Sequence, residues 1–143
     1  MSQLESLLKT HYAGVNAGDL DTALSVFDPD CETVTPDGPL KGADAFRAMG
    51  EAFRTAAPDN RIEAVRTFET GDTIIVEGVY SGTHTGPLAS PAGPIPATGR
   101  AFSFPFCDVL RARDGKFVSH HIYWDNVTFL ARLGLAGQPT ESR

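Results

Sequence analysis

The stretch AFSFPFCDVLRARDGKFVSHHIYWD, residues 101–125, decides the fold of this chain. Both halves are rich in aromatic and β-branched residues, and a Gly-containing turn separates them, which is typical of a β-hairpin. Successive side chains of a strand point to opposite faces, so His121, Tyr123 and Asp125 share one face. His120, Ile122 and Trp124 share the other. We expect the face with Asp125 to line a cavity, and we place the chemistry there.

A second hairpin is predicted upstream. Residues 62–68 alternate in polarity, Gly71-Asp72 makes a turn, and residues 73–84 return as a long strand. Between the hairpins, residues 86–99 contain four prolines, too many for a strand ladder. We expect this segment to be an ordered or mobile loop near the sheet edge, and it could act as a lid.

Three helices are predicted before the hairpins, because apolar residues recur at spacings of three and four. The first covers residues 3–17 and is closed by Gly18. The second begins after an N-cap at Asp19 and is ended by Pro29, with Phe27 on its buried stripe. After a short strand at residues 32–35, the third covers residues 43–57. Helices followed by a four-stranded antiparallel meander predict the α+β class.

Composition excludes several functions. The chain has 143 residues, 41% of them apolar, and a net charge of −6, which predicts one globular domain over residues 1–143 with a flexible tail at 135–143. Without a basic stripe we expect no nucleic-acid partner. The first residues resemble no signal peptide and no apolar run is long enough to span a bilayer, so we expect a cytoplasmic protein without a membrane partner. We interpret Cys31 and Cys107 as reduced packing residues.

Several motifs, in order, carry a resemblance to a known family. They are Asn16-Ala17-Gly18-Asp19, Ala57-Pro58-Asp59, Gly82-Thr83-His84-Thr85-Gly86, Asp114-Gly115-Lys116, and Asp125 placed eight residues before Leu133-Gly134. From Leu4 to Gly134 the chain resembles the SnoaL-like polyketide cyclase family of the NTF2-like superfamily. The resemblance implies a cone-shaped α+β barrel: a strongly bent antiparallel sheet packs on the N-terminal helices, a short C-terminal helix follows, and an apolar pocket remains. It also implies a homodimer.

The resemblance further implies an activity. In cyclases of this family, a carboxylate on the last strand acts as general acid/base in an intramolecular aldol condensation, without metal or organic cofactor. By position that residue is Asp125, and its pocket must raise its pKa by desolvation. The implied substrate is a small to medium apolar molecule that contains a carbonyl. One departure is Arg132, where the family usually has Gln.

Two further residues are candidates for the chemistry. His84 could donate a hydrogen bond to a substrate carbonyl, or it could fix the proline-rich loop. Asp108 lies opposite the last strand and could assist proton transfer, or it could form an ion pair with Arg111 or Arg100; we favour the ion pair. Candidates for substrate contact, with core packing as the alternative for the aromatic ones, are Tyr12, Phe27, Phe104, Phe106, His121 and Tyr123.

Alternatives stay open for the whole site. Asp125 could serve only as the N-cap of the last helix. The chain could be an isomerase or epoxide hydrolase of the same superfamily, or a non-catalytic ligand-binding or dimerisation module. His120 and His121 face opposite ways on a strand, so we expect no metal site.

Overall fold

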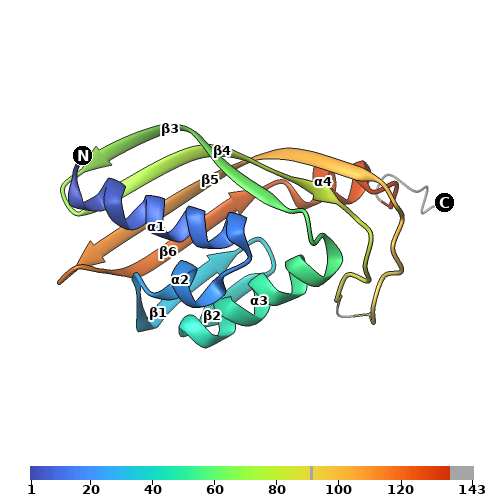
Figure 1. Ribbon diagram of the computed structural model, residues 1–143, viewed down its shortest axis with the longest axis horizontal. Coiled ribbons are helices and arrows are strands. Elements are labelled where there is room, and N and C mark those ends of the chain that lie inside the picture. Colours follow the sequence, from blue (N-terminus) through green and yellow to red (C-terminus); the bar gives the residue numbers. More distant parts are fainter. Residues whose placement is uncertain (91, 136–143) are drawn as a thin grey trace.

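The structure is a computed structural model that describes residues 1–90 and 92–135. Of the expected tail, all but Leu135 lies outside the described residues. Along the chain (Figure 1) the elements are α1 (Gln3–Ala17), α2 (Leu20–Leu24), β1 (Phe27–Thr35), β2 (Gly38–Lys41), α3 (Ala43–Ala56), β3 (Arg61–Thr70), β4 (Thr73–Thr83), β5 (Ala101–Arg113), β6 (Lys116–Trp124) and α4 (Asn126–Arg132). This confirms the predicted α+β class.

The strands form one six-stranded sheet in the order β2-β1-β6-β5-β4-β3. The two predicted hairpins are confirmed as β3–β4 and β5–β6, both antiparallel. The Asp114-Gly115 turn has positive φ at both residues, 55° and 79°, as a tight two-residue hairpin requires.

The sequence prediction missed part of the sheet. Strand β1 pairs in parallel with β6, and β2 pairs with β1 as the edge strand. The sheet therefore has two strands more than the four-stranded meander that was predicted. The second helix ends at Leu24, and Phe27 already belongs to β1, contrary to the prediction. Pro29 is tolerated in the strand because the register between β1 and β6 is interrupted from Phe27 to Glu32, where no ladder hydrogen bond needs its missing N–H.

The first helix begins and ends as the sequence predicts. Ser2 and Glu5 form a capping box at its start, and Gly18 ends it with φ of 73° in the left-handed region. Gly14 has a different purpose: a Cβ there would lie 2.4 Å from the backbone nitrogen of Ala23. Only glycine lets α2 approach α1 this closely, and that approach places a backbone carbonyl of α2 beside α1.

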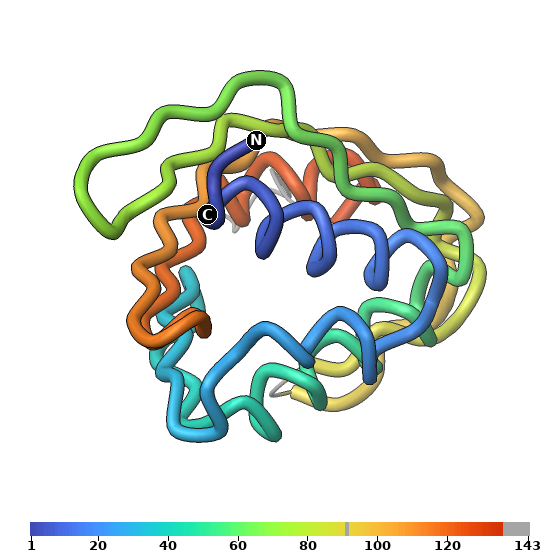
Figure 2. The backbone as a smooth tube through the Cα atoms, turned by 60° about the vertical axis from the view of Figure 1, so that its left-hand side comes forward, coloured from blue at the N-terminus to red at the C-terminus, as the bar shows by residue number. Residues whose placement is uncertain are grey.

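The sheet curves around α1, and α2 and α3 close the open side of the curve (Figure 2). One core cluster joins α1 to the inner face of the sheet, and a second lies between the end of α3 and α4. The segment between β4 and β5 packs at this second cluster, where the amides of Thr85 and Gly86 both donate to the carbonyl of Ala56. It therefore joins two interior strands rather than lying near the sheet edge as we expected.

A bulge in β6 decides which of its side chains face the helices. Ser119 pairs with Arg111 and Phe117 pairs with Ala112, so Val118 is an extra residue without a partner on β5. Phe117 and His120 are consequently both buried although they are three residues apart. No helix within the described residues is long and apolar enough to cross a membrane. Both cysteines are free thiols.

Candidate active site

A cavity of about 100 Å³ lies between the sheet and the helices. Its wall is mostly apolar, with Phe104 and Phe106 of β5 and Ile122 and Trp124 of β6 on the sheet side. The volume is below the range of about 300–1,000 Å³ of typical ligand pockets, so the cavity fits a group about the size of one ring. Leu20, Arg47 and Arg54 line both this cavity and a depression on the outer surface, which places the mouth between α2 and α3.

Asp108 is the carboxylate of this cavity. It continues the inward row of β5, in which every second residue from Phe102 to Ala112 is buried, and its own exposed fraction is 2%. The hydroxyl of Tyr12 on α1 donates to Asp108 Oδ2 at 2.5 Å. His120 Nε2 on β6 lies 3.2 Å from Asp108 Oδ1. Two elements therefore hold the carboxylate in one orientation.

The groups around Asp108 are themselves fixed. His120 Nδ1 lies 3.3 Å from the hydroxyl of Thr33 on β1, so both ring nitrogens have partners. Burial, and next the charge of Asp108, raises the pKa of Tyr12 above its ordinary value. Tyr12 thus remains a neutral phenol that donates a hydrogen bond to the carboxylate of Asp108.

His11 is a second imidazole on the cavity wall. Its Nδ1 lies 2.7 Å from the carbonyl oxygen of Ala23, which can only accept, so Nδ1 carries the proton. Burial, followed by the neighbouring His120, lowers the pKa of His11 to about 4. The ring is therefore neutral at pH 7, and its Nε2 is an acceptor with no hydrogen bond to a described residue.

Comparison with known proteins agrees with this architecture. The family model described as SnoaL-like polyketide cyclase matches residues 5–133. The chain belongs to this family. None of the curated proteins matches the sequence significantly.

Two solved structures are similar to this SnoaL-like chain over almost their whole lengths. AclR from Streptomyces galilaeus, a candidate hydroxylase, is 26% identical, with 93% of this chain and 98% of that chain covered and a TM-score of 0.78. IdmH from Streptomyces antibioticus, a candidate polyketide cyclase, is 27% identical over 93% and 99%, with a TM-score of 0.78. A Catenulispora acidiphila protein with a ketosteroid isomerase-like fold, 19% identical over 90% and 92% with a TM-score of 0.75, supports the fold. The NTF2-like fold prediction is thereby confirmed.

In this SnoaL-like chain the predicted orientation of the last strand is wrong. His120, Ile122 and Trp124 line the cavity, whereas His121 and Tyr123 lie on the outer face of the sheet, where Tyr123 is 56% exposed. The bulge at Val118 and the apolar character of Ile122 and Trp124 explain the difference, because the more apolar face packs inward.

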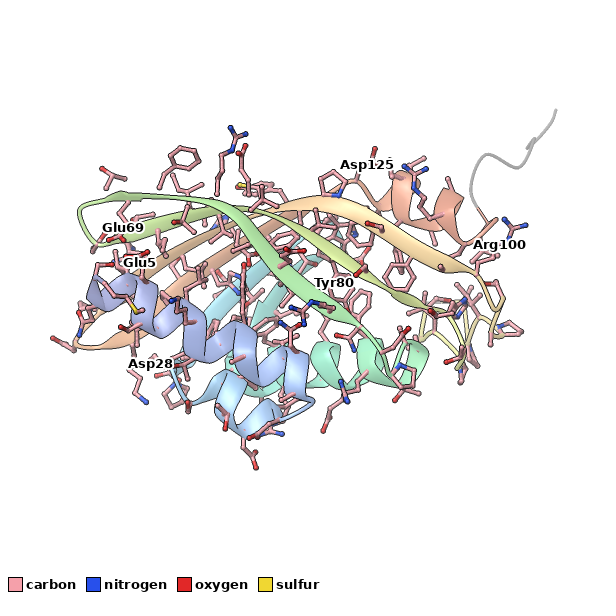
Figure 3. The ribbon with its side chains drawn as sticks, turned by 45° about the horizontal axis from the view of Figure 1, so that its top comes forward. Glu5, Asp28, Glu69, Tyr80, Arg100 and Asp125 are labelled. Atoms are coloured by element: carbon pink, nitrogen blue, oxygen red, sulfur yellow. The ribbon has the colours of Figure 1, made fainter. Side chains whose placement is uncertain are left out.

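Asp125 also lies outside the cavity. Its carboxylate accepts hydrogen bonds from the amides of Val127 and Thr128 at 3.0 and 3.2 Å and from the Thr128 hydroxyl at 2.8 Å, and so caps α4. The Thr128 hydroxyl is the first cause that lowers the pKa of Asp125, whereas a buried general base would need a raised one. Figure 3 shows Asp125 at the outer surface beside α4, and Tyr80 on the helix side of the sheet.

His84 is buried but is not among the residues that line the cavity. Its Nδ1 accepts a hydrogen bond from the amide of Thr98 at 3.3 Å and lies 3.0 Å from the Thr98 hydroxyl. Burial lowers the pKa of His84. This arrangement corresponds to the interpretation that His84 fixes the proline-rich loop.

The remaining predicted residues fall into two groups. Phe104, Phe106 and Asp108 line the cavity. Tyr12 and Phe27 do not line it: Tyr12 donates to Asp108, and the ring centroid of Phe27 is 5.5 Å from that of His120. The favoured ion pair of Asp108 is wrong, because Arg111 pairs with Asp72 instead and Asp108 pairs with His120.

Neither His11 nor His120 is among the catalytic residues predicted from the sequence. His11 follows Leu4 and Leu8 on the buried stripe of α1, and its polarity on that stripe was the available signal. No group of three or more His, Cys, Asp or Glu side chains in the described part of the chain is arranged to hold a metal ion.

Proposed function

We propose that this protein is a cyclase-type enzyme that removes a proton next to a carbonyl, with Asp108 rather than Asp125 as general acid/base. The observation that carries the proposal is the buried Asp108 carboxylate, held by Tyr12 and His120 at the wall of an apolar cavity. The family match and the similarity to IdmH support an intramolecular aldol reaction. The substrate is a small to medium apolar carbonyl compound.

The proposed reaction balances without a cofactor. Asp108 takes the proton of a C–H bond next to a carbonyl, which leaves an enolate and a protonated carboxyl group. The enolate carbon attacks a second carbonyl carbon of the same molecule, a C–C bond forms, and the new alkoxide takes the proton back. Every proton returns, so one carboxyl group is sufficient.

The surroundings of Asp108 are suited to this task. Tyr12 and His120 leave one lone pair on each Asp108 oxygen and fix its position, which removes the cost of orienting the base. The aromatic wall excludes water, and electrostatic interactions inside the cavity are stronger as a result. His11 Nε2 adds a neutral acceptor for a substrate hydroxyl.

Hydrogen–deuterium exchange tests the proposal without knowledge of the natural substrate. The incorporation of deuterium from D₂O beside the carbonyl of cyclohexanone is followed by NMR. The parent protein should accelerate exchange over buffer, and Asp108→Asn should lower this acceleration by about 10²–10⁴.

Asp125→Asn is the matched control, because it makes the same chemical change on the outer face. It should keep the parental exchange rate. If Asp108→Asn exchanged as fast as the parent, or if only Asp125→Asn were slow, the assignment of Asp108 would be wrong. A protein that binds ketones but exchanges no proton would instead be a ligand-binding module.

A further inference from the structure

The wall of the cavity carries polar groups that the proposed reaction does not use. Arg54 of α3, Tyr80 of β4 and Asn60 before β3 all line the cavity. Arg54 and Tyr80 are close enough for the guanidinium charge to act on the phenol, opposing the rise in the pKa of Tyr80 that burial causes. A cation, a phenol and an amide therefore line the same cavity, and the cation lies at its mouth.

Although Asp19 and Glu51 line the same surface depression, Arg54 is not paired with either of them within the described residues. Its neighbour at the mouth, Arg47, forms an ion pair with Asp21, but Arg54 has neither an ion pair nor a hydrogen bond to a described residue. The guanidinium lies against Gly18, where a Cβ would come within 2.3 Å of its carbon. Gly18 thus leaves the space in which the guanidinium sits.

The polar atoms of Tyr80 and Asn60 are also free to bind a ligand. Asn60 Nδ2 donates to the carbonyl of Ala57, and Asn60 Oδ1 has no hydrogen-bond partner among the described residues. The Tyr80 hydroxyl has none either. Among the described residues, His84 Nε2 is the one fully buried side-chain polar atom without a hydrogen bond. The other two atoms must therefore contact open space, and the space that both residues line is the cavity.

We propose that the substrate carries a carboxylate, which binds to Arg54 and Tyr80 at the mouth while its carbonyl faces Asp108. The proposal rests on the function proposed above and names the substrate class: an apolar carbonyl acid about one ring in size. A guanidinium presents parallel N–H donors that match the two oxygens of a carboxylate, and the Tyr80 phenol donates a further hydrogen bond. Asn60 Oδ1 accepts from a hydroxyl or enol next to it.

Charge also fixes the direction of binding. Asp108 is 2% exposed and repels an anion, whereas Arg54 lies where the cavity meets the surface. The low polarity of the wall strengthens both interactions. A carboxylate is therefore attracted to the mouth and kept from the base, which leaves the carbonyl end of the same molecule for Asp108.

Binding of benzoate and of its uncharged isostere benzamide, measured by calorimetry or NMR titration, tests the proposal. The parent should bind benzoate at least about tenfold more tightly, the factor that corresponds to a charge-assisted hydrogen bond. Arg54→Met should reduce this ratio to about one, Arg54→Lys should retain part of it, and Tyr80→Phe should lower it. Arg47→Gln, which removes the other arginine of the mouth, should keep it, because Asp21 already neutralises Arg47.

The proposal would be overturned by the absence of a preference for benzoate in the parent, or by a preference that survives in Arg54→Met. Equal loss in Arg47→Gln would also overturn it, since a general positive field would then be responsible. Arg54→Lys keeps the test valid if Arg54→Met does not fold. Because this assay measures binding alone, a charge preference without any deuterium exchange would refute the proposed reaction and leave the carboxylate site standing.

Discussion

Replacing Tyr12 with Phe is the most direct test of the buried cluster. Tyr12 is 7% exposed, and Phe keeps its ring contacts, including the one with Phe106 at a centroid distance of 6.3 Å. The change removes only the hydroxyl that donates to Asp108 at 2.5 Å. A hydrogen bond to a charged group contributes about 1.5–3 kcal/mol, so the free energy of unfolding should fall by that amount.

Urea and thermal unfolding measure this loss. For a domain of this size each kcal/mol moves Tm by about 2–4 °C, so Tyr12→Phe should lower Tm by about 3–12 °C. Tyr123→Phe is the matched control: its hydroxyl is 3.4 Å from His121 Nδ1 on the exposed face, and its removal should change stability by less than about 0.5 kcal/mol.

A double-mutant cycle isolates the contact from the rest of the ring. In an Asp108→Leu background the carboxylate is absent, so Tyr12→Phe should cost at least about 1 kcal/mol less than in the parent. A Tm of Tyr12→Phe within about 1 °C of the parent, or a cycle without coupling, would refute the reasoning that this hydrogen bond orders the cluster.

Four other outcomes are expected. The pKa of His11 is about 4 in the folded protein and 6.5 ordinarily, so its contribution to the free energy of unfolding is complete above pH 6.5. About 3 kcal/mol of this free energy should be lost as the pH falls from 6.5 to 4. In urea titrations, the stability of His11→Gln should therefore depend less on pH than that of the parent. Asp125→Ala should lower Tm because α4 loses its cap, whereas Asp125→Asn should match the parent in Tm and exchange rate. Light scattering at micromolar concentration should give the mass of a dimer, because Val65, Phe68 and Tyr123 expose apolar surface that a second copy of the chain would cover. The mass of a monomer would contradict this expectation. A chelator should change neither Tm nor exchange; a loss of either would reveal a metal requirement.

Local sequence patterns were sufficient for most of the fold. The helix ends at Ser2 and Gly18 and the Asp114-Gly115 turn depend on neighbouring residues, which is why they could be predicted. The parallel pairing of β1 with β6 joins residues far apart in sequence, and no local pattern in residues 27–35 indicates it. The strand prediction there was consequently too short.

The site could be predicted in part. The alternation of Phe102, Phe104 and Phe106 places Asp108 on the same buried face, and this signal was available. The orientation of β6 was misjudged because Asp125 was given more weight than the apolar pair Ile122 and Trp124. The meeting of Arg54, Tyr80 and Asn60 depends on how three separate elements pack, and a single sequence does not contain that information in local form.

The cost of the Asp108 cluster favours a role in chemistry over one in stability. Burial of a carboxylate and an imidazole costs hydration free energy that is about as large as their mutual attraction. Proteins with apolar residues of similar volume at such positions are often equally stable or more stable. Asp108 lies in a row that otherwise presents phenylalanine, leucine and alanine to the interior, so an apolar residue would fit the pattern there. If the cluster served stability, adding Asp108→Leu to the Tyr12→Phe variant would lower the free energy of unfolding further. If it serves proton transfer, the same variant should keep or gain stability in the Tyr12→Phe background while deuterium exchange disappears. Opposite changes in stability and exchange would identify a group that the fold tolerates because the reaction needs it.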